Sequence, residues 1–303
     1  MTKNPAIRGY LFVLMSVIAT SNVYIFSKAA LNELHIVQFG VLWYGMALLW
    51  NTLFSAGTKK IRLARSLYKK YYRLLIIIAL IEICSVSLFF TAINTMENPA
   101  IVSFIGNVGP IFITILGILI LKERFSTVEA IGIILTLAGV FIISYRPGSD
   151  IFIKGIWLVI FSSLFFSVKI IIVKSYIHKI DPTILAINRS FCLLGFSVIM
   201  ALSLGSTFEV STKALLNIFI GSLLGPFLTT LSNYWALQYI EASRASILGS
   251  TKSLVVLLGA YLYFGTLPLY YQIMGGIITV LGVILISYGS IIHKKSDLKD
   301  RLF

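Results

Sequence analysis

Residues 132–145 read GIILTLAGVFIISY, and residues 275–288 read GGIITVLGVILISY. The two stretches align without a gap, and the matched positions include Gly132/Gly275, Thr136/Thr279, Gly139/Gly282, Val140/Val283 and Ser144/Ser287. Upstream, AINTME at 92–97 resembles ALQYIE at 236–241 after one inserted residue. Nearer the start of each half, Ser16 and Lys28 align weakly with Ser162 and Lys174. These matches predict an internal duplication.

The composition predicts an integral membrane protein. Of 303 residues, 58% are hydrophobic and 12% are charged, and a soluble chain of this size would need more polar surface. The apolar residues form blocks of roughly 20 residues, the length of a helix that crosses ~30 Å of hydrocarbon. We expect ten transmembrane helices, at Tyr10–Leu31, Ile36–Ala56, Leu74–Asn94, Ala100–Leu121, Ser126–Tyr145, Gly155–Val173, Thr183–Leu204, Leu215–Gln238, Ser243–Phe264 and Leu269–Ile292.

The duplication and the spans together predict an all-α membrane fold of two five-helix halves, residues 1–148 and 149–303. Because five is odd, the second half starts at the opposite face, so the repeats are inverted about an axis in the membrane plane. Secondary transporters use this architecture and bind substrate near the midplane between the halves. Some channels also contain inverted repeats, which leaves that alternative open at this point.

The net charge of +14 is distributed unevenly. With the N-terminus in the cytoplasm, most Lys and Arg fall in cytoplasmic segments, and only Arg146, Lys154 and Lys213 fall outside. The positive-inside rule then places both termini in the cytoplasm of a multi-pass cytoplasmic-membrane protein. We interpret the basic cluster Lys59–Arg73 as a contact with the anionic inner leaflet rather than with nucleic acid.

Residues 98–143 read NPAIVSFIGNVGPIFITILGILILKERFSTVEAIGIILTLAGVFII. With Asn22 and Lys28 in TSNVYIFSK and Arg189 in PTILAINRS, this stretch resembles the EamA-type repeat of the drug/metabolite transporter (DMT) superfamily. The resemblance covers the whole chain and implies a membrane transporter, without implying a substrate. ILGSTKSLVVLLGAYLYFG at 247–265 instead resembles the ninth span of the nucleotide-sugar and triose-phosphate branch, where a lysine at the place of Lys252 contacts an anion.

Five ionisable residues fall inside the predicted spans, at a cost of roughly 2.5–3.5 kcal/mol for each one at a helix centre. Lys28 is near the outer end of its span, so we expect it to reach water. Lys252 lies about 13 Å from the boundary, too deep for that. We predict that Lys252, Lys169 and Arg189 contact substrate. Glu82 either neutralises a lysine or is a protonatable coupling group, and a bridge between Glu82 and Lys252 is the alternative to anion contact.

The deep groups carry excess positive charge, which an anionic substrate would neutralise. Neutral polar and aromatic residues complete the predicted site, although amides in membrane helices usually bond to a neighbouring helix. These candidates are Asn22, Tyr24, Trp43, Asn94, Asn107, Asn233 and Tyr234. The predicted hinges for alternating access are Gly109, Pro110, Gly225 and Pro226.

The favoured function is a secondary transporter of a small metabolite that carries a carboxylate or phosphate. An exchanger of phosphorylated sugars or nucleotide-sugars, or a lipid-linked phosphate flippase, is the alternative within transport. A membrane-embedded lipid-modifying enzyme is the alternative of another class, but the loops carry only isolated acids. We expect no catalytic residue, metal or cofactor, and Cys84 and Cys192 follow no disulfide or metal pattern. Substrate identity, transport direction, coupling and oligomeric state stay open.

Overall fold

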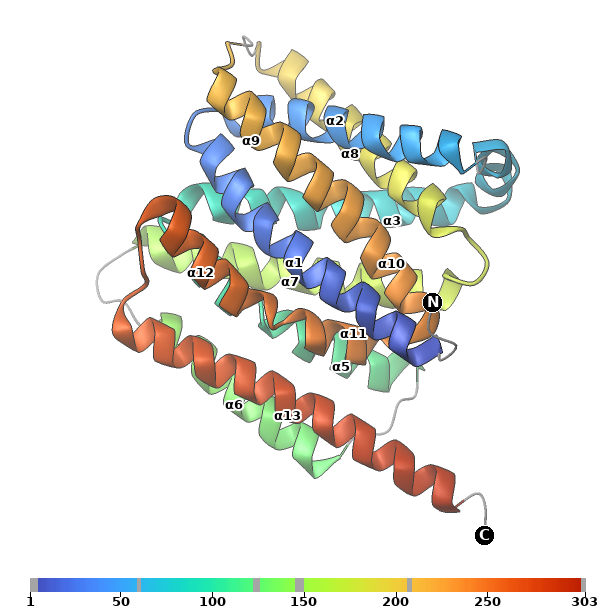
Figure 1. Cartoon of the computed structure of the whole chain (residues 1–303), viewed down its shortest axis with the longest axis vertical. Coiled ribbons are helices and arrows are strands. Elements are labelled where there is room, and N and C mark those ends of the chain that lie inside the picture. The colour runs from blue at the N-terminus through green and yellow to red at the C-terminus, as the bar shows by residue number, and fades with distance from the viewer. Residues whose placement is uncertain (1–4, 59–60, 122–125, 145–149, 206–208, 301–303) are drawn as a thin grey trace.

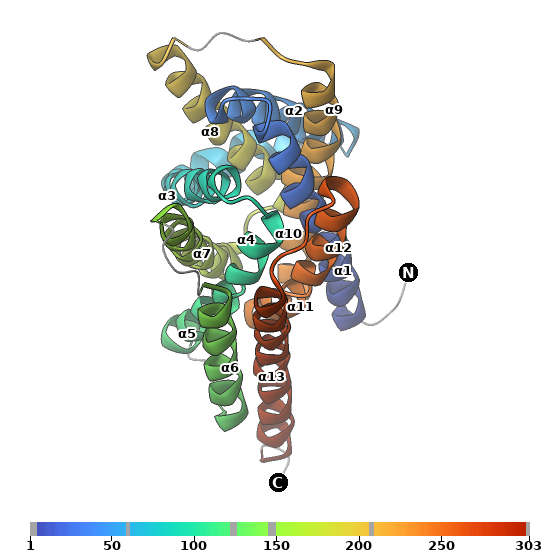
Figure 2. The same ribbon diagram turned by 90° about the vertical axis from the view of Figure 1, so that its left-hand side faces the viewer.

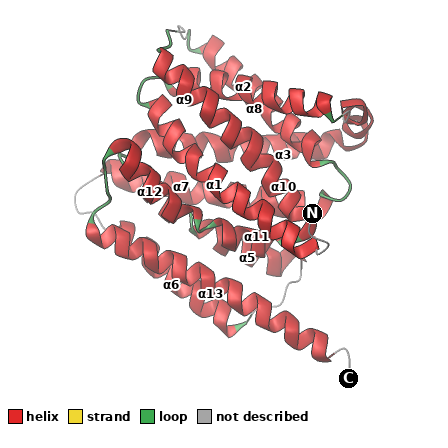
Figure 3. Cartoon of the chain, in the orientation of Figure 1, coloured by secondary structure: helices red, strands yellow, loops and turns green. Residues whose placement is uncertain are grey.

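The computed structural model describes residues 5–58, 61–121, 126–144, 150–205 and 209–300, and all regular structure in those ranges is helical (Figures 1 and 3). The elements are α1 (Pro5–Leu31), α2 (Ile36–Gly57), α3 (Ile61–Thr95), α4 (Pro99–Ile105), α5 (Val108–Leu121), α6 (Thr127–Ser144), α7 (Asp150–Tyr176), α8 (Pro182–Ser203), α9 (Thr212–Ser222), the π-helix η1 (Leu223–Thr229), α10 (Thr230–Tyr239), α11 (Ala242–Gly249), α12 (Lys252–Phe264) and α13 (Tyr270–Asp300).

The helices have the length and surface of membrane spans. Seven helical stretches within the described residues are long and apolar enough to cross a bilayer, and three shorter apolar helices accompany them at Ala130–Ile143, Lys252–Phe264 and Tyr270–Leu285. Large apolar side chains such as Phe141, Leu202 and Leu262 are exposed on the outside, where lipid would surround them. A helical membrane protein is therefore confirmed, while the full set of ten inverted spans stays a prediction.

Three of the predicted spans contain a break or a widened turn. In the span predicted over 100–121, Pro110 has no N–H to donate to the carbonyl of Gly106, and α4 ends at Ile105. Pro226 similarly lies inside the π-turn of η1. The span predicted over 243–264 is interrupted at Ser250–Thr251, where the Thr251 hydroxyl bonds the carbonyl of Leu248 at 2.7 Å.

Helices far apart in sequence pack in pairs. α1 lies along α9, η1 and α10, and α7 lies along α3. α2 packs against α8, α6 packs against α13, and the broken pair α4 and α5 lies beside α12 and α11 (Figures 1 and 2). Each pair thus joins one helix from the first predicted half to one from the second.

The repeated glycines of 132–145 and 275–288 lie in the contact between α6 and α13. A Cβ placed on Gly139 would lie 2.6 Å from the carbonyl oxygen of Gly275, and one placed on Gly282 would lie 2.7 Å from that of Gly132. The two backbones therefore touch directly, which only glycine permits here. Since Gly139 meets Gly275 while Gly132 meets Gly282, the helices run antiparallel.

The prediction that Lys28 reaches water is wrong. Its side chain is buried, and its Nζ donates a hydrogen bond to the backbone carbonyl of Asn94 at 3.1 Å. Lys174 does the same elsewhere in the fold, with its Nζ 2.6 Å from the carbonyl oxygen of Leu237 and 2.8 Å from that of Ile240. The last turn of a helix has carbonyls without intrahelical partners, and a nearby ammonium satisfies them without reaching solvent.

Candidate functional site

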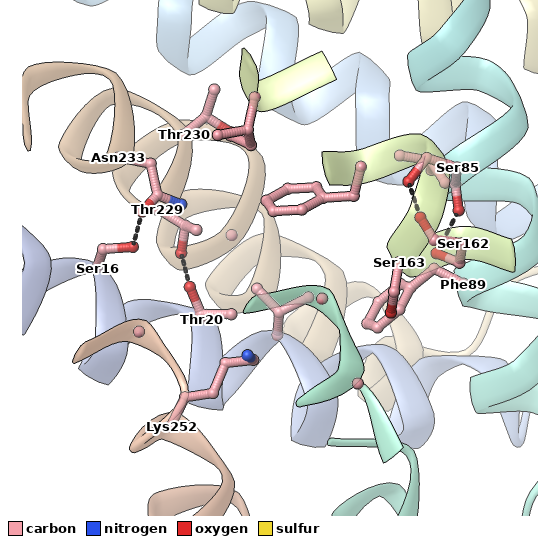
Figure 4. Close-up of a pocket in the computed structure, with 18 of the residues that line it drawn as sticks. Ser16, Thr20, Ser85, Phe89, Ser162, Ser163, Thr229, Thr230, Asn233 and Lys252 are labelled. Carbon is pink, nitrogen blue, oxygen red and sulfur yellow. Dashed lines mark hydrogen bonds between the residues drawn. The ribbon is translucent and has the colours of Figure 1, made fainter. Parts of the chain in front are cut away.

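A cavity of about 230 Å³ lies between two helical walls. One wall, called here the α1/α10 wall, consists of α1, η1 and α10; the other, the α3/α7 wall, consists of α3 and α7 (Figure 4). Residues of α2, α5, α8 and α11, together with Gly106 and Lys252, complete the lining. The cavity therefore collects side chains from both predicted halves of the chain.

Hydrogen bonds inside each wall orient the polar lining. In the α1/α10 wall, Ser16 Oγ donates to Asn233 Oδ1 at 2.8 Å, and the hydroxyls of Thr20 and Thr229 are 3.3 Å apart. In the α3/α7 wall, Ser85 and Ser162 each donate a hydroxyl to the other's backbone carbonyl, at 3.0 and 2.8 Å (Figure 4). These bonds hold neutral polar groups in fixed orientations at the cavity surface.

Lys252 is the first residue of α12, directly after the break at Ser250–Thr251. Its side chain extends into the cavity from the side of the α1/α10 wall (Figure 4). Among the described residues, no carboxylate pairs with its ammonium and no hydrogen bond to it occurs. The predicted alternative, a bridge to Glu82, is therefore not formed in this structure.

Glu82 instead pairs with the other two deep cations. Its Oε1 accepts a hydrogen bond from Arg189 Nε at 2.6 Å, and its Oε2 lies 3.0 Å from Lys169 Nζ. Arg189 also donates from Nη1 to Thr230 Oγ1 at 3.3 Å, and its guanidinium carbon lies 5.8 Å from the centroid of the Tyr44 ring. The predicted role of Glu82 in neutralising a lysine fits this geometry.

Lys169 stands behind the cavity surface. It is not among the lining residues, whereas Glu82 and Arg189 are. Its ammonium lies 4.2 Å from the centroid of the Phe166 ring in addition to its contact with Glu82. Lys169 thus supports the position of Glu82, and its predicted contact with substrate is not formed by the cavity lining in this structure.

The other sequence candidates divide into two groups. Residues that line the cavity are Tyr24, Trp43, Asn233 and the predicted hinges Gly109, Pro110, Gly225 and Pro226. Four candidates lie elsewhere: the Asn22 amide bonds the carbonyl of Ile18, Asn94 is exposed, Asn107 bonds Thr279 and Ser253, and Tyr234 is buried in an apolar cluster.

The sequence reasoning missed most of the hydroxyl groups that line the cavity. These residues are Ser16, Thr20, Ser85, Ser162, Ser163, Thr229 and Thr230. A usable signal was present in the first span, where Ser16, Thr20 and Tyr24 recur at intervals of four residues and so share one helix face. Among the described residues, no group of three or more His, Cys, Asp or Glu side chains could hold a metal ion.

Comparison with known proteins identifies the family. The sequence model of the EamA-like transporter family matches residues 7–145 and again residues 153–288. The chain belongs to the EamA-like transporter family. This confirms the resemblance to the DMT superfamily.

Curated relatives of this EamA-like chain are also named as transporters. An uncharacterized transporter of Archaeoglobus fulgidus is 25% identical over 184 residues, which cover 61% of this chain and 59% of the relative. The uncharacterized transporter YdfC of Bacillus subtilis is 25% identical over 193 residues, 61% of each chain. A further A. fulgidus transporter is 30% identical over 172 residues, 54% of this chain and 60% of the relative. The chain thus spans about three fifths of the length of these relatives.

The fold has a solved counterpart. A protein crystal structure that is 11% identical superposes with a TM-score of 0.71, and the match covers 92% of this chain and 96% of the other. At that identity the likeness establishes the shared helix arrangement alone.

Proposed function

We propose that this EamA-like transporter is a secondary carrier that moves a small metabolite bearing a carboxylate or phosphate by alternating access. The observation that carries the proposal is the ammonium of Lys252, which faces the cavity without a partner among the described residues. Glu82 already pairs with Lys169 and Arg189, so this cluster keeps one excess positive charge and Lys252 adds another. A buried charge is stabilised by an opposite one, and a bound anion would supply it.

The helix pairing supports an inverted repeat of ten spans. The contact between Gly139 and Gly275 has its repeat-related counterpart in Gly282 with Gly132, as a two-fold axis requires. The packing of α1 along η1 and α10 likewise corresponds to that of α7 along α3. The family model also matches the chain twice, once in each predicted half. Alternating access by movement of one wall against the other fits this arrangement.

The proposed orientation places both termini in the cytoplasm. Lys69 and Lys70, in the N-terminal part of α3, are exposed, which supports a contact of this end with anionic lipid. Lys59 and Lys60 of the predicted cluster lie outside the described residues.

The cavity volume favours a small substrate. About 230 Å³ is below the roughly 300–1,000 Å³ of sites for drug-sized ligands. A compact carboxylate or phosphate ester is therefore a better fit than a nucleotide-sugar. An exchanger of small phosphorylated compounds remains the second candidate, because the sequence around Lys252 resembles that branch.

Uptake into proteoliposomes tests the proposal. The purified chain is compared on labelled carboxylates, phosphate esters, neutral sugars and organic cations. Anions should be transported, Lys252→Met should lower uptake at least 10-fold, and Lys252→Arg should retain more activity because it keeps the charge. Lys213→Met is the matched control, since Lys213 is exposed and lies outside the cavity lining. Preferred transport of a cation, or full activity of Lys252→Met, would overturn the anion proposal.

A further inference from the structure

Two lysines that the repeat aligns make the same type of contact. Lys28 is in the last turn of α1 and Lys174 is in the last turn of α7, each the first helix of its half. Lys28 donates to a carbonyl in the last turn of α3, and Lys174 donates to carbonyls at the end of α10. Since α3 ends within the segment 92–97 and α10 ends within the aligned segment 236–241, the two contacts are repeat-related.

Each contact joins the two walls of the cavity. Lys28 belongs to the α1/α10 wall and bonds α3 of the opposite wall. Lys174 belongs to the α3/α7 wall and bonds α10 of the opposite wall. A bond from an ammonium to a helix C-terminal carbonyl is charge-assisted and stronger than a neutral one, so both contacts resist separation of the walls.

The two contacts lie at opposite ends of the cavity. Ser16 pairs with Asn233 and Thr20 pairs with Thr229, so α1 and α10 run antiparallel. The end of α10 therefore lies beside the start of α1, where a Cβ on Gly9 would meet the side chain of Ile240 at 2.6 Å. Lys174 bonds this end, whereas Lys28 is near the other end of α1, beyond the cavity residues Ser16 to Tyr24.

We infer that Lys28 and Lys174 are gating residues, each holding the walls together at one end of the cavity. This inference rests on the proposed alternating access. Opening at one end requires the walls to part there, which breaks the lysine–carbonyl contact at that end and leaves the other intact. The structure holds both contacts at once. In the proposed orientation Lys28 gates the outer end and Lys174 the cytoplasmic end.

Thiol labelling from each side of the membrane tests the inference. In a Cys84→Ser/Cys192→Ser background, Ser163→Cys places one reactive thiol on the cavity lining. A membrane-impermeant thiol reagent is added either to right-side-out or to inverted vesicles, without any substrate. Lys28→Met should speed labelling from one side about 10-fold, and Lys174→Met should speed it by a similar factor from the other side, as expected for the loss of a charge-assisted hydrogen bond that holds the closed state.

Matched variants separate gating from general loosening. Lys213→Met and Lys179→Met remove exposed lysines near the same two ends of the cavity. Lys213 contacts Glu33 and Lys179 contacts Tyr176, and neither contact joins the two walls, so these variants should not change the labelling rate. Lys28→Arg and Lys174→Arg should keep the labelling rate as slow as in the unsubstituted lysine background, because an arginine can also donate to the carbonyls. Equal acceleration from both sides by either Met variant, or no acceleration by both, would overturn the inference. Since labelling needs no substrate, a wrong substrate class would affect the uptake assay and leave this result unchanged.

Discussion

The carboxylate of Glu82 is paired with two buried or mostly buried cations, Lys169 and Arg189. Charged side chains at this depth are expensive unless they are compensated, and the penalty depends on how many partners a substitution leaves unpaired. Glu82 therefore stabilises a site with two like charges that would otherwise repel each other. The three residues come from α3, α7 and α8, so the cluster also ties one predicted half to the other.

Glu82→Gln should be the most destabilising single change in this cluster. It leaves both Lys169 and Arg189 uncompensated, and we expect the free energy of unfolding to fall by about 3–5 kcal/mol. Lys169→Met keeps the pair of Glu82 with Arg189 and should cost less. The double variant Glu82→Gln/Lys169→Met should be more stable than Glu82→Gln alone. Thermal unfolding in detergent measures all three, and an unchanged midpoint for Glu82→Gln would contradict the role of the pair.

The sequence identifies the deep charges because depth follows from position along a span. Lys252 and Arg189 were found in this way, and both line the cavity. The direction in which a side chain points around its helix depends on the packing partner, which the sequence does not specify. Asn94 is consequently exposed, and Asn107, next to the helix break, bonds Thr279 of α13 instead of facing the cavity.

At the scale of helices, glycine determines how closely α6 and α13 approach. The four aligned glycines occur at the points where the two backbones touch, so any side chain there must push the helices apart. The sequence predicts this interface indirectly, because a repeated glycine pattern indicates close packing. The hinges predicted at Pro110 and Pro226 coincide with the break between α4 and α5 and with the π-turn of η1. The break at Ser250–Thr251 has no proline, and only its alignment with Asn107–Val108, at the junction of α4 and α5, could have indicated it.

Gly139→Ala should destabilise the contact between α6 and α13. The added Cβ would lie 2.6 Å from the carbonyl oxygen of Gly275 and 2.7 Å from the Cγ2 atom of Thr279, so the helices must separate. Overpacking of this kind costs about 1–3 kcal/mol. Gly195→Ala in α8 is the control, because a Cβ there meets no atom within 4 Å and should be neutral or stabilising through helix propensity. Equal thermal midpoints for the two variants would show that the glycine contact is not tight.

At the scale of the whole molecule, the duplicated sequence and the helix pairing describe one arrangement. The first helix of each half packs along the third span of the other half: α1 lies along η1 and α10, and α7 lies along α3. The remaining pairs join equivalent helices of the two halves, α2 with α8 and α6 with α13. Because the first helix of each half packs against the other half, the two five-helix halves enclose one cavity between them. It also explains why polar residues from both halves meet there, although neither half alone forms the site.

An inverted repeat makes a sharp prediction about topology, since equivalent loops of the two halves must face opposite sides of the membrane. The connection between α1 and α2 contains the exposed residue Asn32, and its counterpart between α7 and α8 contains the exposed residue His178. In the Cys84→Ser/Cys192→Ser background, Asn32→Cys should react with an impermeant thiol reagent added outside intact cells, whereas His178→Cys should react only after permeabilisation. Neither residue lines the cavity, so transport activity serves as the control for folding. Reaction of both thiols from the same side would contradict the inverted repeat and would require a parallel duplication. In a parallel duplication the first helices of the two halves cross the membrane in the same direction, and Lys28 and Lys174 would lie at the same end of the cavity.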